Sequence, residues 1–112
     1  GERLMDWAVV GFGNIDVDEE RMQEIIDLMI GDKKEVIDRL TNNSGCDFEE
    51  VEGTNGTITF KMWGNKGIDY DRLDAIKAYC KKNKIGIVIN VNEYIESDSS
   101  GYYYNSTEVG EE

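Results

Sequence analysis

The segment that decides the fold runs from Asn55 to Trp63 and reads N-G-T-I-T-F-K-M-W. An Asn-Gly pair favours a two-residue hairpin turn, because both residues tolerate a positive φ. Ile58, Phe60 and Met62 then alternate with more polar neighbours, which is the period of a strand with one buried face. We therefore expect residues 57–63 to form the second strand of a hairpin and residues 47–52 to form the first.

Two elements are expected before this hairpin. Residues 4–12 form a short apolar run that predicts a central strand. Asp16 then stands where a helix N-cap would be, with Glu19 three residues later as in a capping box. A stripe of apolar residues with helical spacing predicts the helix itself: Met22, Ile25, Ile26 and Met29. A second short helix, or a kinked continuation of the first, extends this prediction to Leu40.

The part of the chain after the hairpin predicts one more helix and two more strands. Helical spacing of apolar residues places a helix from about residue 69 to residue 84, and strands are expected at 85–95 and 102–104. The resulting order, β-α-β-β-α-β with an added C-terminal strand, indicates an α+β fold of the ferredoxin-like type, with an antiparallel sheet and helices on one face. A chain of 112 residues is expected to form a single domain over 1–112, with 108–112 as a mobile tail.

Negative charge is the unusual property of the composition. The chain has 24 acidic and 12 basic residues, for a net charge of −12. The acids concentrate in residues 1–60, which hold 15 acids against 5 bases, and in residues 93–112, which hold 6 acids and no base. This distribution disfavours direct contact with nucleic acid, because phosphates repel such a surface.

Several kinds of chemistry lack the residues that they need. The chain has no histidine, which removes Ser-His and Cys-His nucleophiles and the commonest metal ligand. Gly11-Phe12-Gly13 lacks the third glycine of a phosphate loop, and Cys46 and Cys80 have no CxxC spacing. We therefore expect that the protein is not an enzyme and that it has no cofactor, no bound metal and no disulfide. No apolar run approaches the roughly 18 residues of a membrane span, so a cytoplasmic protein is expected.

Three groups of residues are candidates for contact with a partner. Glu20, Glu24 and Asp27 fall at i, i+4 and i+7 and are expected to share one helix face, where like charges cost a few tenths of a kcal/mol per pair. The expected edge strand supplies four more acids, and the last strand supplies two tyrosines: Asp47, Glu49, Glu50, Glu52, Tyr102 and Tyr104. Charge on an edge strand also prevents aggregation, so a purely solvated surface remains the alternative.

Two resemblances suggest a function. Trp63-Gly64, a helix, Tyr94-x-Glu96 and Gly101-Tyr102 resemble the second half of small ferredoxin-like proteins of phages and plasmids. In size, acidity and lack of catalytic residues, the chain resembles anti-CRISPR and anti-restriction inhibitors of mobile elements. The resemblance implies an inhibitor that blocks a basic surface of a nucleic-acid-processing enzyme, with nucleic-acid mimicry as one means. A toxin-immunity protein and an accessory or oligomerising module are the alternatives, and we expect a monomer or weak homodimer.

Overall fold

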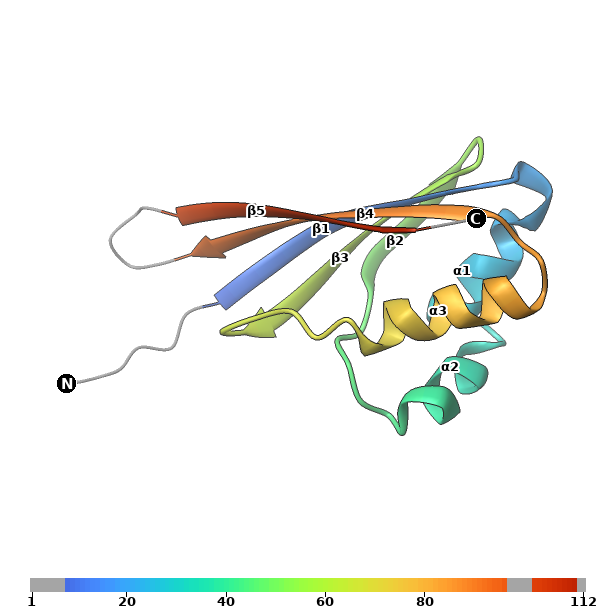
Figure 1. Cartoon of the computed structure of the whole chain (residues 1–112), viewed down its shortest axis with the longest axis horizontal. Coiled ribbons are helices and arrows are strands. Elements are labelled where there is room, and N and C mark those ends of the chain that lie inside the picture. The colour runs from blue at the N-terminus through green and yellow to red at the C-terminus, as the bar shows by residue number, and fades with distance from the viewer. Residues whose placement is uncertain (1–7, 97–101, 111–112) are drawn as a thin grey trace.

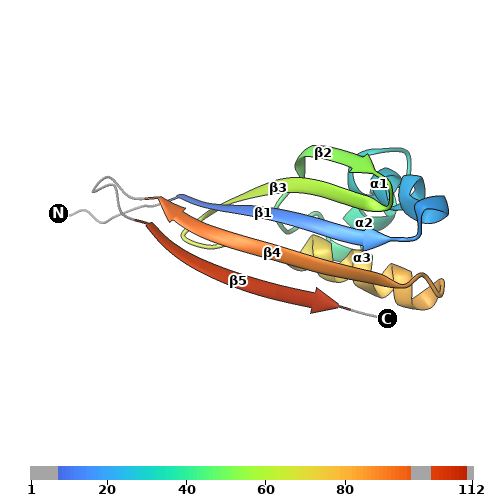
Figure 2. The same cartoon turned by 90° about the horizontal axis from the view of Figure 1, so that it is seen from above.

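The computed structural model describes residues 8–96 and 102–110, and side chains within residues 8–94. Five strands form one antiparallel sheet in the order β2-β3-β1-β4-β5. Three α-helices lie on one face of this sheet (Figures 1 and 2). The elements in chain order are β1 (Ala8–Val17), a one-turn 3-10 helix η1 (Glu19–Arg21), α1 (Met22–Ile30), α2 (Lys34–Thr41), β2 (Glu49–Thr54), β3 (Thr57–Asn65), α3 (Asp71–Lys82), β4 (Ile87–Glu96) and β5 (Tyr102–Gly110).

The predicted α+β class is confirmed, with an antiparallel sheet that contains the order β2-β3-β1-β4. The structure supports this coarser description and leaves the ferredoxin-like assignment a prediction; two α-helices connect β1 to β2. The first of them ends at Gly31, where the backbone N–H groups of Gly31 and Lys33 both donate to the carbonyl of Asp27. The added strand after β4 is present as β5. The predicted mobile tail overlaps β5 up to Gly110, and residues 111–112 lie outside the described residues.

The predicted helix start at Asp16 was wrong, because β1 continues to Val17. Ile15 is held in the strand by neighbours on both sides, since it pairs with Ile58 of β3 and Ile89 of β4. Asp16 accepts a hydrogen bond from the Thr57 hydroxyl at 2.9 Å instead of capping a helix. Pairing in the sheet therefore overrides the local capping signal, and the residue before the first helical turn is Asp18 instead of Asp16.

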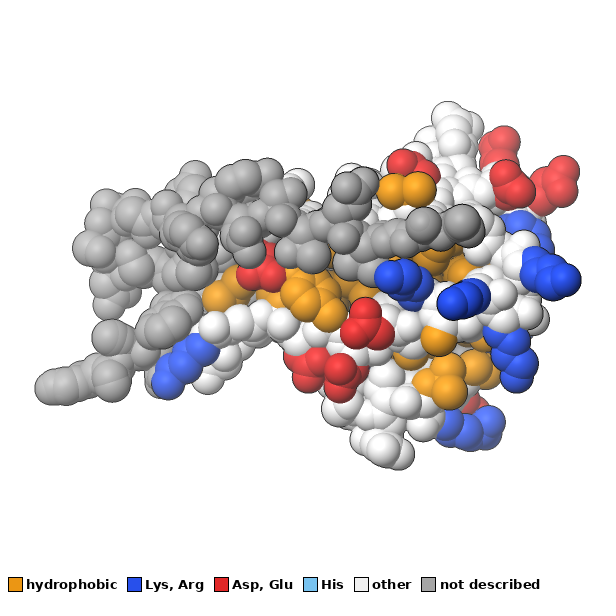
Figure 3. All heavy atoms as spheres, viewed as in Figure 1, with side chains coloured by type: hydrophobic (Ala, Val, Ile, Leu, Met, Phe, Trp, Pro, Cys, Tyr) orange, Lys and Arg blue, Asp and Glu red, His pale blue; other side chains and the backbone are white. Residues whose placement is uncertain are grey.

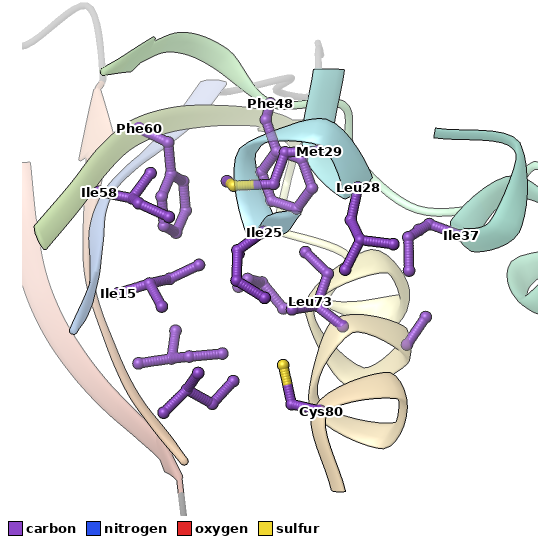
Figure 4. Packing of buried hydrophobic residues seen from close by; sticks show 14 of the residues in the cluster. Ile15, Ile25, Leu28, Met29, Ile37, Phe48, Ile58, Phe60, Leu73 and Cys80 are labelled. Atoms are coloured by element: carbon purple, nitrogen blue, oxygen red, sulfur yellow. The ribbon is translucent and has the colours of Figure 1, made fainter. Parts of the chain in front are cut away.

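The hydrophobic core fills the space between the inner face of the sheet and the helices. Figure 4 shows Leu28 of α1 pointing toward Ile37 of α2 and Leu73 of α3, and all three side chains are fully buried. On the sheet side, the Phe60 ring packs edge-on against Phe48, with ring centroids 5.3 Å apart. One core therefore joins the three helices to the sheet.

Gly13 leaves the space that the Phe60 ring occupies. The two residues are direct cross-strand neighbours in β1 and β3. A Cβ atom added at Gly13 would lie 2.2 Å from Cζ of Phe60, which is far inside van der Waals contact. Phe60 itself is 3% exposed, so the ring has no solvent space into which it could move. The pair fixes how closely the ring approaches β1.

A buried arginine connects the helices. Arg72 of α3 is 5% exposed and donates from Nη1 to the carboxylate of Asp38 in α2. Its Nε lies 3.4 Å from the carboxylate of Asp47, in the segment before β2, although the geometry is not that of a hydrogen bond. The guanidinium holds the pKa of the Asp38 carboxyl below its usual range. Arg72 thus links α3 to α2 and to the start of β2.

Candidate interaction surface

The sheet face turned away from the helices is called the open sheet face below. Figure 2 shows the strands side by side with the helices behind them. Alternate residues of each strand are buried in the core, so the residues between them lie on the open sheet face. Its side chains in β1, β3 and β4 are those of Val10, Phe12, Asn14, Asp16, Thr57, Thr59, Lys61, Trp63, Val88, Asn90, Asn92 and Tyr94.

An aromatic patch crosses the three central strands of this face. Phe12 of β1 is 46% exposed and Trp63 of β3 is 39% exposed, which is unusual for side chains of this size. The Phe12 ring packs edge-on against Tyr94 of β4, with centroids 5.8 Å apart. Val10 pairs with Trp63 on one side and Tyr94 on the other, and it is 5% exposed. We name Val10, Phe12, Trp63 and Tyr94 the aromatic patch.

The lysine beside the patch is already engaged. The Lys61 ammonium lies 5.7 Å from the centroid of the Phe12 ring and 5.3 Å from that of Trp63. It also lies 3.4 Å from the carboxylate of Glu50, and its side chain is 22% exposed. The rings of the patch therefore accept a cation, with a carboxylate as its counter-ion.

The acids of β2 border this patch. Glu49 pairs with Lys61 and Glu52 pairs with Thr59, so both glutamates share the open sheet face with their cross-strand partners. The register shifts between them, and Glu50 has a φ of 52°, which marks a bulge. Glu49 and Glu52 thus share a sheet face with Phe12 and Trp63, and Glu50 reaches the same rings through Lys61. The sequence analysis did not select Phe12 and Trp63. The outward position of Trp63 in the alternating strand was the available signal.

Asp47 is separated from the other acids of the predicted edge strand. It precedes β2, and its carboxylate lies 3.4 Å from Nε of Arg72 and 3.9 Å from Nζ of Lys34. These contacts direct it toward the helices. Tyr102 and Tyr104 lie opposite Glu96 and Tyr94 in the register of β4 and β5, and their side chains lie outside the described residues.

The predicted acidic helix face is divided between two consecutive elements. Glu24 and Asp27 lie in α1, and Glu20 lies in η1, the turn that directly precedes it. The carboxylate of Glu24 accepts hydrogen bonds from the Tyr79 hydroxyl at 2.6 Å and from Nε of Arg21 at 3.0 Å. Asp27 accepts one from Gln23. Glu24 therefore contacts α3 instead of presenting a free charge.

Replacing Glu24 by Gln is expected to lower the free energy of unfolding by about 1 kcal/mol after solvent screening, and thus Tm by about 4 °C. The hydrogen bonds from Tyr79 and then Arg21 hold the pKa of Glu24 below its usual range. Their stabilisation is complete above the unfolded pKa of about 4.3 and is lost as the pH falls through the folded pKa. In thermal melts from pH 7 to pH 3, the Tm of Glu24→Gln should therefore fall less with decreasing pH than the Tm of wild type. Glu20→Gln is the control, and equal effects of the two variants would contradict this role.

Two kinds of site are not found in the part of the chain that the structure describes. None of the helices in 8–96 is long and apolar enough to cross a membrane. Over the described ranges, no three or more Cys, Asp and Glu side chains gather as metal ligands would. Comparison with protein-family models, curated proteins and solved structures finds no match, so the open sheet face is the candidate site on its geometry alone.

Proposed function

We propose that this protein is an inhibitor that binds a basic surface of a nucleic-acid-processing partner through its open sheet face. The observation that carries the proposal is the aromatic patch beside the acids of β2, on a sheet face that the three helices leave uncovered. Large aromatic side chains supply most of the binding energy in many protein interfaces. Carboxylates at the rim accelerate association with a basic partner.

The charges on the open sheet face favour a protein over a nucleic acid. Lys61 is its one cation among the described residues, and that lysine is held by Glu50 and the two rings. Asp16, Glu49 and Glu52 add carboxylates on the same face. A phosphate backbone would meet more negative than positive charge there, whereas a basic protein surface would meet complementary charge.

The chemistry of the face favours an arginine of the partner as the central contact. A guanidinium can stack on the Phe12 or Trp63 ring and bond to a glutamate of β2 at the same time. Lys61 already makes contacts of this kind, since it lies over both rings and next to Glu50. A toxin-immunity protein that blocks a basic nuclease would use the same surface, so it is a special case of this proposal.

The double replacement Glu49→Gln/Glu52→Gln tests the acidic rim. We expect the variant to associate with its partner about tenfold more slowly at low salt and with a flatter salt dependence, because electrostatic steering is lost. Stability should change little, since both side chains are exposed. The measurement is the association rate constant at two salt concentrations, against the protein that the immobilised chain recovers from a lysate of its source cells.

Glu35→Gln/Glu20→Gln is the matched control, because it removes two carboxylates at exposed positions away from this face. Equal rates and equal salt slopes for the rim variant and wild type would overturn the role of the acids. Tight binding of a fluorescent single-stranded oligonucleotide to the open sheet face would overturn the choice of a protein partner.

A further inference from the structure

Helix α3 carries its exposed acids and its exposed lysines in opposite halves. Asp71 and Asp74 lie in the N-terminal half, and Lys77, Lys81 and Lys82 lie toward the C-terminal end, all of them exposed. Figure 3 shows acidic side chains and basic side chains gathered at opposite ends of this region of the surface. This face of the helix therefore has a positive end and a negative end.

The charges of this face form no ion pairs with the described residues, unlike many of those on the other helices. Arg21 pairs with Glu24, Lys34 with Asp38, and Arg39 with Glu35. In contrast, Asp74 and the three α3 lysines form no ion pair and no side-chain hydrogen bond with any described residue. Asp71 accepts one hydrogen bond, from the Ser44 hydroxyl at 2.9 Å. Two unpaired sets of opposite charge thus lie on one helix.

A groove of mixed polarity lies along the acidic half. It has a volume of about 490 Å³ and lies between the end of α2 and α3, where Leu40, Ala75 and Ala78 contribute apolar surface and Asp71 and Asp74 contribute carboxylates. Leu40 is 59% exposed, which is the largest exposure among the large hydrophobic residues of the described chain. The small side chains of Ala75 and Ala78 leave room for another helix to approach closely.

We propose that α3 and this groove bind a second copy of the chain, with the two α3 helices antiparallel about a two-fold axis at Ala78. Ala78 lies midway between Asp74 and Lys82, so the axis brings Asp74 of each copy opposite Lys82 of the other. Lys81 of each copy then lies near the turn that carries Asp71 and Asp74. Every charge contact occurs twice, and Leu40 adds apolar area on both sides of the axis.

The distribution of charge favours a second copy over a different partner. A uniformly basic segment would match the aspartates and repel the lysines, and a polyanion would do the reverse. The same helix in the antiparallel direction places Asp74 opposite Lys82 in both halves at once. With 12 residues, α3 is about 18 Å long, so the contact is smaller than the roughly 800 Å² per partner of a stable interface. The dimer is accordingly weak.

This dimer is independent of the proposed partner contact. Helix α3 lies on the face of the sheet opposite the open sheet face (Figures 1 and 2), so the contact between copies does not cover the aromatic patch. Glu49→Gln/Glu52→Gln should leave self-association unchanged within about twofold, because rim charges act mainly at their own interface. Failure of one proposal can thus be recognised without the other.

Exchanging the charges of Asp74 and Lys82 tests the proposal better than varying the salt concentration does. Added salt also screens the repulsion between two copies of charge −12. Sedimentation equilibrium over a wide concentration range measures self-association of the full chain. Asp74→Lys and Lys82→Asp should each weaken it about tenfold or more, since each puts two like-charge pairs at the interface. Asp74→Lys/Lys82→Asp should restore it to within about threefold of wild type, because the pairs are re-formed in the opposite sense.

Glu20→Lys is the control for a change in net charge, and it should not weaken self-association. Far-UV circular dichroism and Tm show whether each variant remains folded. If one single variant fails to fold, self-association of the double variant still tests the charge pairs. A wild-type chain that remains monomeric at millimolar concentration would overturn the proposal. So would single variants that behave like Glu20→Lys, or a double variant that stays as weak as its parents.

Discussion

Gly13→Val is expected to lower the free energy of unfolding by about 3 kcal/mol or more, because it overfills the core at a point that cannot relax. The added Cβ would lie 2.2 Å from Cζ and 2.5 Å from Cε1 of Phe60. The ring is buried and packs against Phe48, so it can move only by displacing other core residues. Small domains are stable by about 5–15 kcal/mol, so this loss removes a large part of the total. Urea unfolding followed by circular dichroism gives the value.

Two comparisons identify the Phe60 ring as the cause. Gly67→Ala should change stability by less than about 0.5 kcal/mol, because a Cβ at Gly67 has no atom within 4 Å. In a Phe60→Ala background, Gly13→Val should cost much less than in wild type, since the atoms that clash have been removed. An equal cost in both backgrounds would show that the strain arises elsewhere in β1.

Phe12→Ser/Trp63→Ser is expected to weaken binding of the partner about 100-fold or more, since truncated aromatic anchors each cost about 2 kcal/mol at many interfaces. The dissociation rate should carry most of the change, because these side chains contribute contact rather than steering. Both are more than a third exposed, so the fold should survive with a loss of about 1 kcal/mol. Surface plasmon resonance gives both rate constants, and a thermal melt checks the fold.

Val88→Ser is the matched control for this variant. Val88 lies on the same open sheet face and is 40% exposed, but it pairs with Asp16, at the other end of β1 from the aromatic patch. We expect its replacement to change the dissociation constant less than about threefold, as for most residues outside the centre of an interface. A similar loss in both variants would mean that general apolarity, and not the aromatic patch, drives binding.

Local patterns in the sequence predicted much of the fold. The Asn55-Gly56 turn and the alternation through Phe60 correctly gave the β2–β3 hairpin, because both signals act within a few residues. The helical spacing through Leu73 likewise gave α3. The predicted helix start at Asp16 was wrong because Asp16 and the acids after it resemble a helix N-cap. The strand that contains Asp16 is instead fixed by pairing with segments more than 40 residues away.

The candidate site was predicted only in part, for a related reason. The acids of β2 stand out in the sequence by their charge alone. Phe12 and Trp63 become a patch only when β1 and β3 pair, and their positions are 51 residues apart. The contact of Glu24 with Tyr79 similarly spans 55 positions, so its charge was counted as free. Such long-range contacts leave no periodic signal in one sequence.

The buried Arg72 also determines how the molecule opens locally. A helix of eight residues such as α2 is only marginally stable in water without tertiary contacts. If α2 left the surface alone, it would take Asp38 away and leave a buried guanidinium without its hydrogen-bonded carboxylate, which is strongly unfavourable. We therefore expect slow fluctuations that expose the amides of α2 to involve α3 as well, so that the two helices exchange their amide hydrogens as one cooperative unit.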